Sequence, residues 1–361
     1  MSTASSSIPT TEILREWGRI GCIGFGGPPT HIALLRDLCV RRRGWIEPHD
    51  FEDAIAACNL LPGPASTQLA IYCAWRLRGR TGALVGGMAF IVPGLLLIVA
   101  LSAVFLATAP PRWIVGAGAG AGAAVAAVAV HAGWSLVPPS WDRTASRFRW
   151  VAYVALGAAA AALVGPWVVL VLLVCGAVEL LLPRGVALFG VAPLVWVAFK
   201  VGALSYGGGF VIIPLMQGDA VGRRHWLTDA QFLNAVALGQ VTPGPVVHTV
   251  AVVGYGAAGV GGAFLAALVA FAPSFVFVLA GGERFDRIRR DERARAFLGG
   301  AGPAAIGAIL GSAIPLGRAL EHPWQFVVLA AAAVALLLLR RGVVPTLVAA
   351  GLVGVVITVG T

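Results

Sequence analysis

The chain has 361 residues, of which 58% are hydrophobic and 12% charged, and its formal net charge is +10. Soluble domains carry roughly 25% charged residues, so this chain has too few polar side chains to cover a water-exposed surface. The composition excludes a soluble globular fold and predicts an all-α polytopic membrane protein. The basic residues lie almost entirely between apolar runs, as is typical of oriented membrane helices, so no nucleic acid partner is expected.

Apolar runs close to the ~20 residues needed to cross a bilayer recur along the chain. They cover residues 84–107, 113–137, 150–182, 186–206, 262–281, 297–316, 324–339 and 343–359. With the interrupted segments between them, these runs predict about ten transmembrane helices in a bacterial-type inner membrane. Residues 1–10 show no basic stretch followed by an apolar core, so no removable signal peptide is expected. The five cysteines have no metal-ligand spacing, and neither a metal nor a cofactor is expected.

The first helical pattern in the chain covers about residues 11–23, with apolar residues on one side and charged residues, including Glu16 and Arg19, on the other. A glycine and proline cluster at residues 24–29 interrupts this pattern, and a second helical piece follows at 30–38. Because glycine and proline both disfavour a helix interior, we expect a broken helix here.

A Pro-Gly-Pro sequence occurs twice, at residues 62–64 and 243–245, inside the apolar segments 51–75 and 232–255. Each proline lacks an amide hydrogen, and its ring clashes with the preceding turn, so neither segment can form one continuous helix. A re-entrant hairpin at the first of these breaks would place the flanking basic loops on one side of the membrane. The positive-inside rule makes that side cytoplasmic.

Both Pro-Gly-Pro sequences belong to a repeat that spans the chain. Aligned at an offset of 181 residues are Arg19 with Lys200, Phe25-Gly26-Gly27 with Tyr206-Gly207-Gly208, Trp45 with Trp226, and Phe51 with Phe232. After one deletion the offset becomes 180, which aligns Pro93 with Pro273. We therefore predict two homologous halves, residues 11–183 and 184–361.

The charge distribution of the halves predicts that the repeat is inverted. The basic loop at 76–80 corresponds to the uncharged stretch 257–261, whereas the turn at 110–112 corresponds to 283–295, which contains six arginines. Exchanged charge between aligned loops is expected when one half lies upside down in the membrane relative to the other. Arginines 223–224 fall on the opposite side and contradict the rule.

The breaks are also where substrate would bind. Lipid offers no hydrogen bonds to backbone groups, so a broken helix must be buried in protein or line a polar cavity, and its exposed N-terminus attracts anions. The predicted substrate-binding residues are Arg19, Phe25, Gly26, Gly27, Pro28, Thr30, His31, Asn59, Pro62, Gly63, Pro64, Ser66, Thr67, Gln68, Lys200, Tyr206, Gly207, Gly208, Gly209, Gln240, Thr242, Pro243, Gly244, Pro245 and His248.

Alternatives stay open at several of these positions. The Ser and Thr residues could merely cap the broken helices, and Arg19 and Lys200 could either flank a dianion or extend to the interface. His31 or His248 could carry protons or have an ordinary polar role. Acidic residues are nearly absent from the expected spans, Glu179 being the one clear candidate, so a cation site is not expected.

The motifs resemble those of the chromate ion transporter (CHR) family in its long two-domain form. The resemblance rests on Gly24-Phe25-Gly26-Gly27-Pro28 with His31-Ile32, Asn59-Leu60-Leu61-Pro62-Gly63-Pro64, Tyr206-Gly207-Gly208-Gly209 with Pro214-Leu215, and Gln240-Val241-Thr242-Pro243-Gly244-Pro245 with Gly254-Tyr255. It covers roughly residues 11–105 and 190–280. Tyr206 departs from the phenylalanine that is commoner in the family. The resemblance implies export of chromate and chromate resistance, with sulfate as a competing analogue.

We therefore predict chromate export by alternating access, as a symporter or an antiporter, with the lipid bilayer as the surrounding partner. Transport of sulfate or another tetrahedral oxyanion, and an anion channel, are the alternatives. An integral-membrane enzyme is not expected, because the spans contain no HExxH motif, paired carboxylates or Ser/His/Asp set. Assembly into a homodimer is left open.

Overall fold

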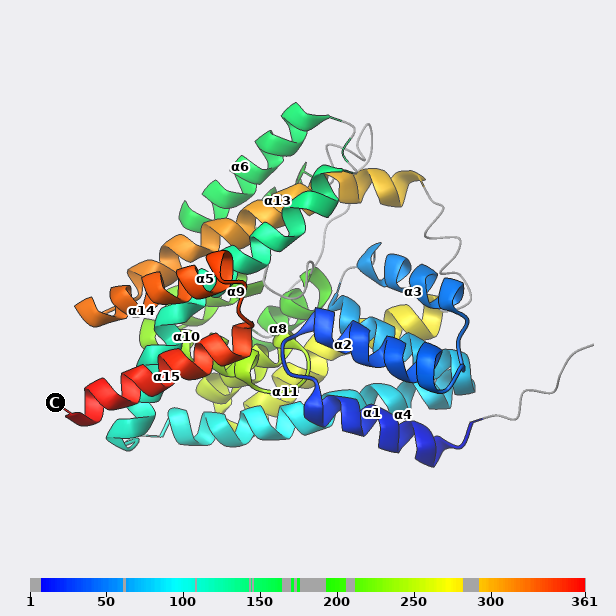
Figure 1. Ribbon diagram of the computed structural model, residues 1–361, viewed down its shortest axis with the longest axis horizontal. Coiled ribbons are helices and arrows are strands. Elements are labelled where there is room, and N and C mark those ends of the chain that lie inside the picture. Colours follow the sequence, from blue (N-terminus) through cyan, green and yellow to red (C-terminus); the bar gives the residue numbers. More distant parts are fainter. Residues whose placement is uncertain are drawn as a thin grey trace, which may run out of the picture.

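A computed structural model describes residues 8–60, 63–107, 109–142, 144, 146–163, 170–171, 174–175, 193–205, 212–281 and 292–360. Over these residues the regular structure is entirely helical, as predicted (Figure 1). The helices of the first half are α1 (Thr10–Ile23), α2 (Pro28–Arg36), η1 (Asp37–Arg42), α3 (Pro48–Leu60), α4 (Ala65–Phe105), α5 (Arg112–Trp141) and α6 (Arg147–Leu163). Those of the second half are α8 (Pro193–Leu204), α9 (Ile212–Gln217), η4 (Gly218–Arg223), α10 (Asp229–Val241), η5 (Val246–His248), α11 (Thr249–Gly281), α13 (Glu292–Arg318), α14 (Pro323–Ala333), η7 (Val334–Leu338) and α15 (Val343–Gly360).

The predicted helix breaks occur where glycine and proline cluster. Helix α1 ends at Ile23 and α2 begins with two prolines, whose fixed φ suits the first turn of a helix. The Pro-Gly-Pro sequences separate α3 from α4 and α10 from η5. The fourth break separates α8 from α9, and its residues 206–211 lie outside the described part of the chain.

The same order of elements occurs in both halves. Helices α2 and α9 each continue into a π-helical segment, at Asp37–Arg42 and at Gly218–Arg223, with the repeat offset of 181 residues. Helices α4 and α11 each contain two residues with non-helical dihedral angles, at 78–79 and at 258–259. The basic stretch 76–80, expected as a loop, includes the two residues that interrupt α4, and a methyl group at Gly82 would meet the carbonyl oxygen of Ala74, so the chain turns back at this point.

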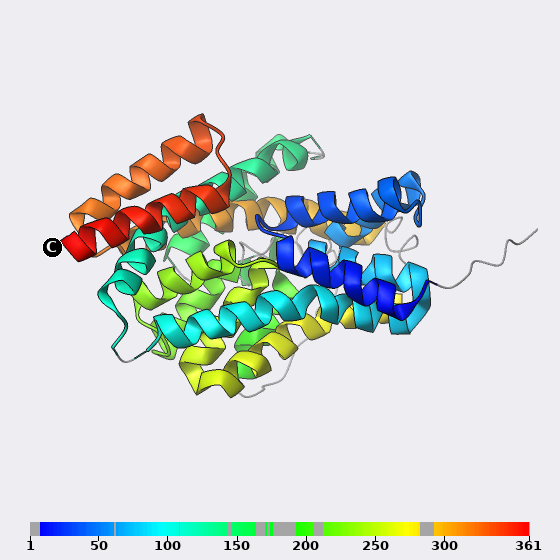
Figure 2. The same ribbon diagram turned by 60° about the horizontal axis from the view of Figure 1, so that its bottom comes forward.

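Helices α4 and α11 pack against each other, while α1 packs on α4 and α8 packs on α11 (Figures 1 and 2). Glycines allow these close contacts. A methyl group at Gly21 would lie 2.7 Å from the carbonyl oxygen of Phe90, and one at Gly202 would overlap the carbonyl of Ala270. Without side chains at these glycines, the backbones approach more closely than other residues permit.

Helices α5, α6, α13, α14 and α15 form a second group in which α5 packs against α13, α14 and α15, and α6 packs against α13 (Figure 1). Small residues again form the contacts. Gly116 of α5 faces the carbonyl of Gly354 on α15, and Gly157 of α6 faces the carbonyl of Ala304 on α13. This helix association relies on close van der Waals contact between small residues, as is typical within membranes.

Five of the described helical segments are long and apolar enough to cross a bilayer. They are Ala65–Phe105, Arg112–Pro138, Val246–Ala280, Gly299–Arg318 and Val343–Gly360. Their outer faces carry exposed apolar side chains, such as Leu352 and Val356 on α15, which lipid would cover. The chain is an integral membrane protein. The total of about ten transmembrane helices remains a prediction, with the shorter apolar helices Pro193–Ala203 and Pro323–Leu338 as further candidates.

Candidate functional site

The breaks of the two halves meet in pairs at the centre of the molecule. The amide of Gly63 donates to the carbonyl of Ser205 at 3.0 Å, and the amide of Gly244 donates to the carbonyl of Gly24 at 3.0 Å. Ser205 and Gly244 follow Gly24 and Gly63 by the same 181 residues, so the two bonds are reciprocal, as a two-fold axis between the halves requires. We call this region the crossing and define it by these four residues.

Gly63 and Gly244 have φ angles of +121° and +101°, which L-residues with side chains rarely adopt. Each lies between two prolines, which supply no amide hydrogens of their own. The glycine amide is therefore the donor through which each Pro-Gly-Pro turn binds the other half. In lipid an unpaired amide would cost several kcal/mol, so this exchange of bonds stabilises both broken helices.

His31 lies at the crossing with hydrogen bonds at both ring nitrogens. Its Nε2 is 2.8 Å from the carbonyl oxygen of Gly24, and its Nδ1 is 3.3 Å from Oγ of Ser66. The carbonyl can only accept, so Nε2 carries the hydrogen, and in the neutral ring Nδ1 accepts from the Ser66 hydroxyl. The ring also meets the edge of Phe90, with centroids 5.0 Å apart.

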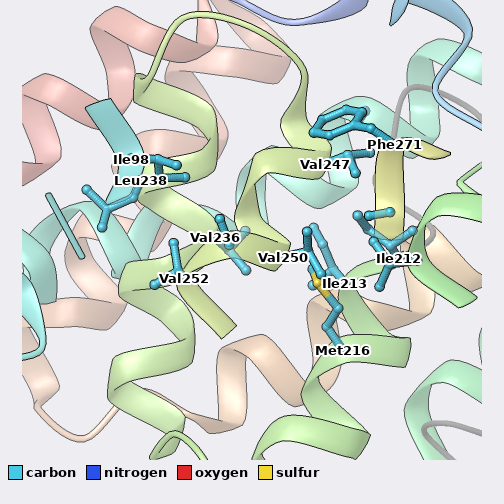
Figure 3. Close-up of a cluster of buried hydrophobic side chains, with 14 of the residues drawn as sticks. Ile98, Ile212, Ile213, Met216, Val236, Leu238, Val247, Val250, Val252 and Phe271 are labelled. Atoms are coloured by element: carbon cyan, nitrogen blue, oxygen red, sulfur yellow. The ribbon is translucent and has the colours of Figure 1, made fainter. Parts of the chain in front are cut away.

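His248 lies next to Gly244, which donates the bond to Gly24. Methyl groups at Gly94 and at Gly244 would each lie 2.8 Å from Cε1 of this ring, which also meets Phe271 edge to face at 5.2 Å. His248 is fully buried, yet neither ring nitrogen has a hydrogen-bond partner among the described residues. Figure 3 shows the adjacent apolar cluster, in which Val247, Val250 and Phe271 gather with side chains of α9.

Four other buried polar groups also lack partners among the residues that the structure describes, three of them within four residues of the crossing and one in α11. They are Oγ1 of Thr67, Oγ of Ser205, Nε2 of Gln240 and Oγ of Ser274. All four can donate a hydrogen bond. Native proteins rarely leave such groups unsatisfied, so water, an ion or a substrate is expected to bind them.

The helix starts at the crossing differ in how many amides they offer. In α4 the first bonded amide is that of Thr67, and in η5 it is that of His248, which leaves two amides before each of them without an intrahelical acceptor. Helix α2 begins with Pro28 and Pro29, which have no amide hydrogens. The Pro-Gly-Pro breaks therefore present more donors to an anion than the Gly-Gly-Pro break does.

Of the two alternatives left open for Lys200, the structure favours burial over extension to the interface, but the side chain is bound to a carboxylate. Its Nζ donates to Asp219 on η4 and lies 5.7 Å from the ring centre of Trp196. Arg223 lies 3.6 Å from the other oxygen of Asp219. Asp219 and Glu16 are buried acidic residues that lie outside the expected spans, and Glu179, the acidic candidate within those spans, lies outside the described residues.

The predicted site residues separate into three groups. Those buried near the crossing are Gly27, His31, Gly63, Pro64, Ser66, Thr67, Gln68, Gln240, Thr242, Pro243, Gly244, Pro245 and His248. Those that the structure does not bury are Arg19, Phe25, Gly26, Pro28 and Thr30. The third group lies outside the part of the chain that the structure describes, and it contains Pro62, Tyr206, Gly207, Gly208, Gly209 and the side chain of Asn59.

Two expectations therefore need correction. Arg19 is exposed whereas Lys200 is buried, so the repeat does not place two equivalent cations around one pocket. Phe25 is 42% exposed, so it does not belong to the buried residues near the crossing. Gly94, Ser205 and Ser274 were not identified from the sequence. Ser205 aligns with Gly24 of the first glycine motif, and Ser274 aligns with Gly94, so the repeat offset was the signal that could have identified them.

Comparisons with known proteins agree with this arrangement of two halves. A family profile described as "Chromate transporter" matches residues 11–180 and 192–355. The chain is 31% identical, over an alignment of 398 positions, to a "Chromate transport protein" of Cupriavidus metallidurans, covering 98% of this chain and 96% of the relative. It is 30% identical to a "Chromate transport protein" of Pseudomonas aeruginosa over 85% of this chain and 81% of that one. A "Probable chromate transport protein" of Synechococcus elongatus is 27% identical, with 86% and 85% covered. No solved structure matches the chain.

Proposed function

The chain belongs to the chromate transporter family, which is a family of transporters and not of enzymes, and from this premise we propose that it exports chromate from the cytoplasm. The observation that carries the proposal is the crossing, where buried amide, hydroxyl and carboxamide donors converge without hydrogen-bond partners among the described residues. Those donors suit the oxygens of a tetrahedral dianion, and none of them belongs to a carboxylate that would repel it.

The substrate would bind next to the two Pro-Gly-Pro turns. Ser66 and Thr67 lie in the first turn of α4, and His248 lies in η5. Gln240 and Thr242 end α10 on the other side of the same break. Positive helix ends favour negative charge in a site that excludes water, so the backbone can hold the dianion without a dedicated side-chain cation. Lys200 then contributes a buried charge already balanced by Asp219, and Arg19 does not contribute.

Transport by alternating access would use the two halves as the moving units. The reciprocal bonds at the crossing support a two-fold relation, and exchanged charge in the aligned loops favours a two-fold axis in the membrane plane, which makes the repeat inverted. In such folds the substrate stays near the midplane while one half tilts against the other. In a plasma membrane that is negative inside, the voltage favours outward movement of a dianion by about 4.6 kcal/mol per 100 mV.

Sulfate is the nearest alternative substrate because it has the same charge and shape, and a channel is the alternative mechanism. Labelled chromate in everted membrane vesicles distinguishes them. We expect saturable uptake that slows when the voltage is collapsed and that excess sulfate inhibits. Vesicles without the protein serve as the control.

Uptake no greater than in those control vesicles would refute chromate export. Flux at channel rates without saturation would favour the channel, and uptake of labelled sulfate but not chromate would favour a sulfate transporter.

A further inference from the structure

The two histidines at the crossing differ in the hydrogen-bond partners of their ring nitrogens. His31 sits between the carbonyl of Gly24, which accepts a hydrogen bond, and the hydroxyl of Ser66, which can donate one. A neutral imidazole has one N–H and one lone pair, so these two partners satisfy it completely. His31 therefore needs no proton and no ligand, and its bonds hold α2 against α1 and α4.

His248 has no such hydroxyl. The carbonyl of Ile91 faces the ring without meeting hydrogen-bond geometry, and no described residue donates to the other nitrogen. Of the described groups on the elements around it, which are α2, α4, α10 and α11, His31 is the titratable one whose charge would reach it. Gly94 and Gly244 line the ring without side chains, and Phe271 offers only its ring.

Placing an oxyanion beside this ring changes the balance of donors and acceptors. A fully deprotonated tetrahedral anion has no hydrogen to give, so it can only accept. A neutral imidazole has one N–H and one lone pair. If it lay between the Ile91 carbonyl oxygen and an oxygen of such an anion, its lone pair would point at one of these two acceptors, whichever way the ring is turned. An imidazolium donates to both oxygens, so the anion and one proton favour each other at this position.

We propose that His248 binds one proton together with each oxyanion and releases both together, which makes the transporter a proton symporter. The only covalent change is one N–H bond formed on the imidazole from a water-borne proton and later broken. This inference rests on the proposed function and adds a coupling ion to it. The charge moved per chromate would then be one negative charge instead of two.

Calorimetric titration of the purified, detergent-solubilised protein with chromate tests the stoichiometry. The titration is done at a mildly alkaline pH, where chromate carries no proton, in two buffers of different ionisation enthalpy. For the unaltered protein we expect the observed enthalpy to depend on the buffer with a slope of about one proton taken up per chromate. Binding should weaken by up to about tenfold for each unit of rising pH, as linkage to one proton requires.

His248→Gln is the test variant, because an amide can still donate to the anion but does not titrate. We expect it to bind chromate with no buffer dependence and little pH dependence. His31→Gln is the matched control, and we expect it to unfold at a lower temperature while keeping the uptake of one proton.

Buffer-independent binding by the unaltered protein would overturn the proposal even if His248→Gln does not fold. Uptake of one proton by His248→Gln would also overturn it and assign the proton elsewhere. Absence of any chromate binding by the folded, unaltered protein would refute the proposed function itself.

Discussion

The two halves share one frame at the crossing and differ in the side chains that complete it. Gly94 of α4, in the first half, leaves room for the ring of His248 in the second half, whereas the residues aligned with these two are Ser274, which is larger than Gly94, and Thr67, which is smaller than His248. The repeat thus supplies the broken backbone and its exchanged hydrogen bonds twice. The exchange of one histidine for one threonine makes the pocket asymmetric, and that asymmetry provides a group able to bind a proton.

The two halves also contain corresponding ion pairs that differ in which helix carries the positive charge. The second half ties α8 to η4 by the buried pair of Lys200 and Asp219. The first half ties α1 to the end of η1 by Glu16 and Arg43, at 3.1 Å, with the charges on the opposite partners. Both pairs join the two arms of a broken helix, which indicates that each half is held together by its own ion pair beside a shared crossing.

The largest expected effect comes from filling the space that His248 occupies. Gly94→Ala would place a methyl group 2.8 Å from Cε1 of His248 and against the carbonyl of Pro243. Overpacking of this kind costs ~1–3 kcal/mol, and we expect at least a tenfold loss of chromate transport in vesicles. The aligned change, Ser274→Ala, removes an unpartnered hydroxyl and should lower transport by only a few fold at normal stability.

Gly261→Ala is the matched control for the glycine change, because a methyl group there meets no atom within 4 Å. Its transport and melting temperature should equal those of the unaltered protein. Normal transport by Gly94→Ala would show that this space is not part of the site.

The second prediction separates the structural role of Lys200 from a direct role in binding chromate. Lys200→Met leaves Asp219 buried and unpaired, which typically destabilises a protein by ~3–5 kcal/mol, so expression and chromate protection of cells should fall sharply. Lys200→Met with Asp219→Leu removes both charges, and the double variant should regain expression because well-packed apolar replacements of a buried pair are usually tolerated.

Chromate uptake by the double variant then decides the role. We expect at least a third of normal transport, because the backbone amides of the crossing hold the anion. A double variant that expresses normally but does not transport would return Lys200 to the substrate site.

The smallest effect on the protein is expected from reporter enzymes that only show on which side of the membrane a residue lies. The interruptions at 78–79 and 258–259 are aligned, and their glycines are exposed at Gly79 and half-buried at Gly259. If the repeat is inverted, reporter enzymes fused after Arg78 and after Gly259 will report opposite sides, with the first in the cytoplasm. Reporters on the same side would show that the two-fold axis runs along the membrane normal and that the repeat is parallel.

Much of the fold could be predicted because its signals are local. Proline and glycine break a helix wherever they occur, so the ends at Ile23, Leu60 and Val241 followed from the sequence. The burial of Glu16 could not be predicted from helical periodicity, because its partner Arg43 lies 27 residues away on another element. Asp219 was missed for the same reason, since its polar neighbours in the sequence concealed the contact with Lys200.

The amino-acid sequence by itself determined that this protein spans a membrane, that its chain is a repeat, and that each half contains two helix breaks, because hydropathy and backbone sterics act over short stretches. Only the tertiary structure decided which breaks meet, which histidine has both nitrogens satisfied and which cation is neutralised. Those outcomes depend on hydrogen bonds and packing between residues that are far apart in the chain. Gly24 with Gly244 is the clearest case, since nothing near either glycine specifies its partner.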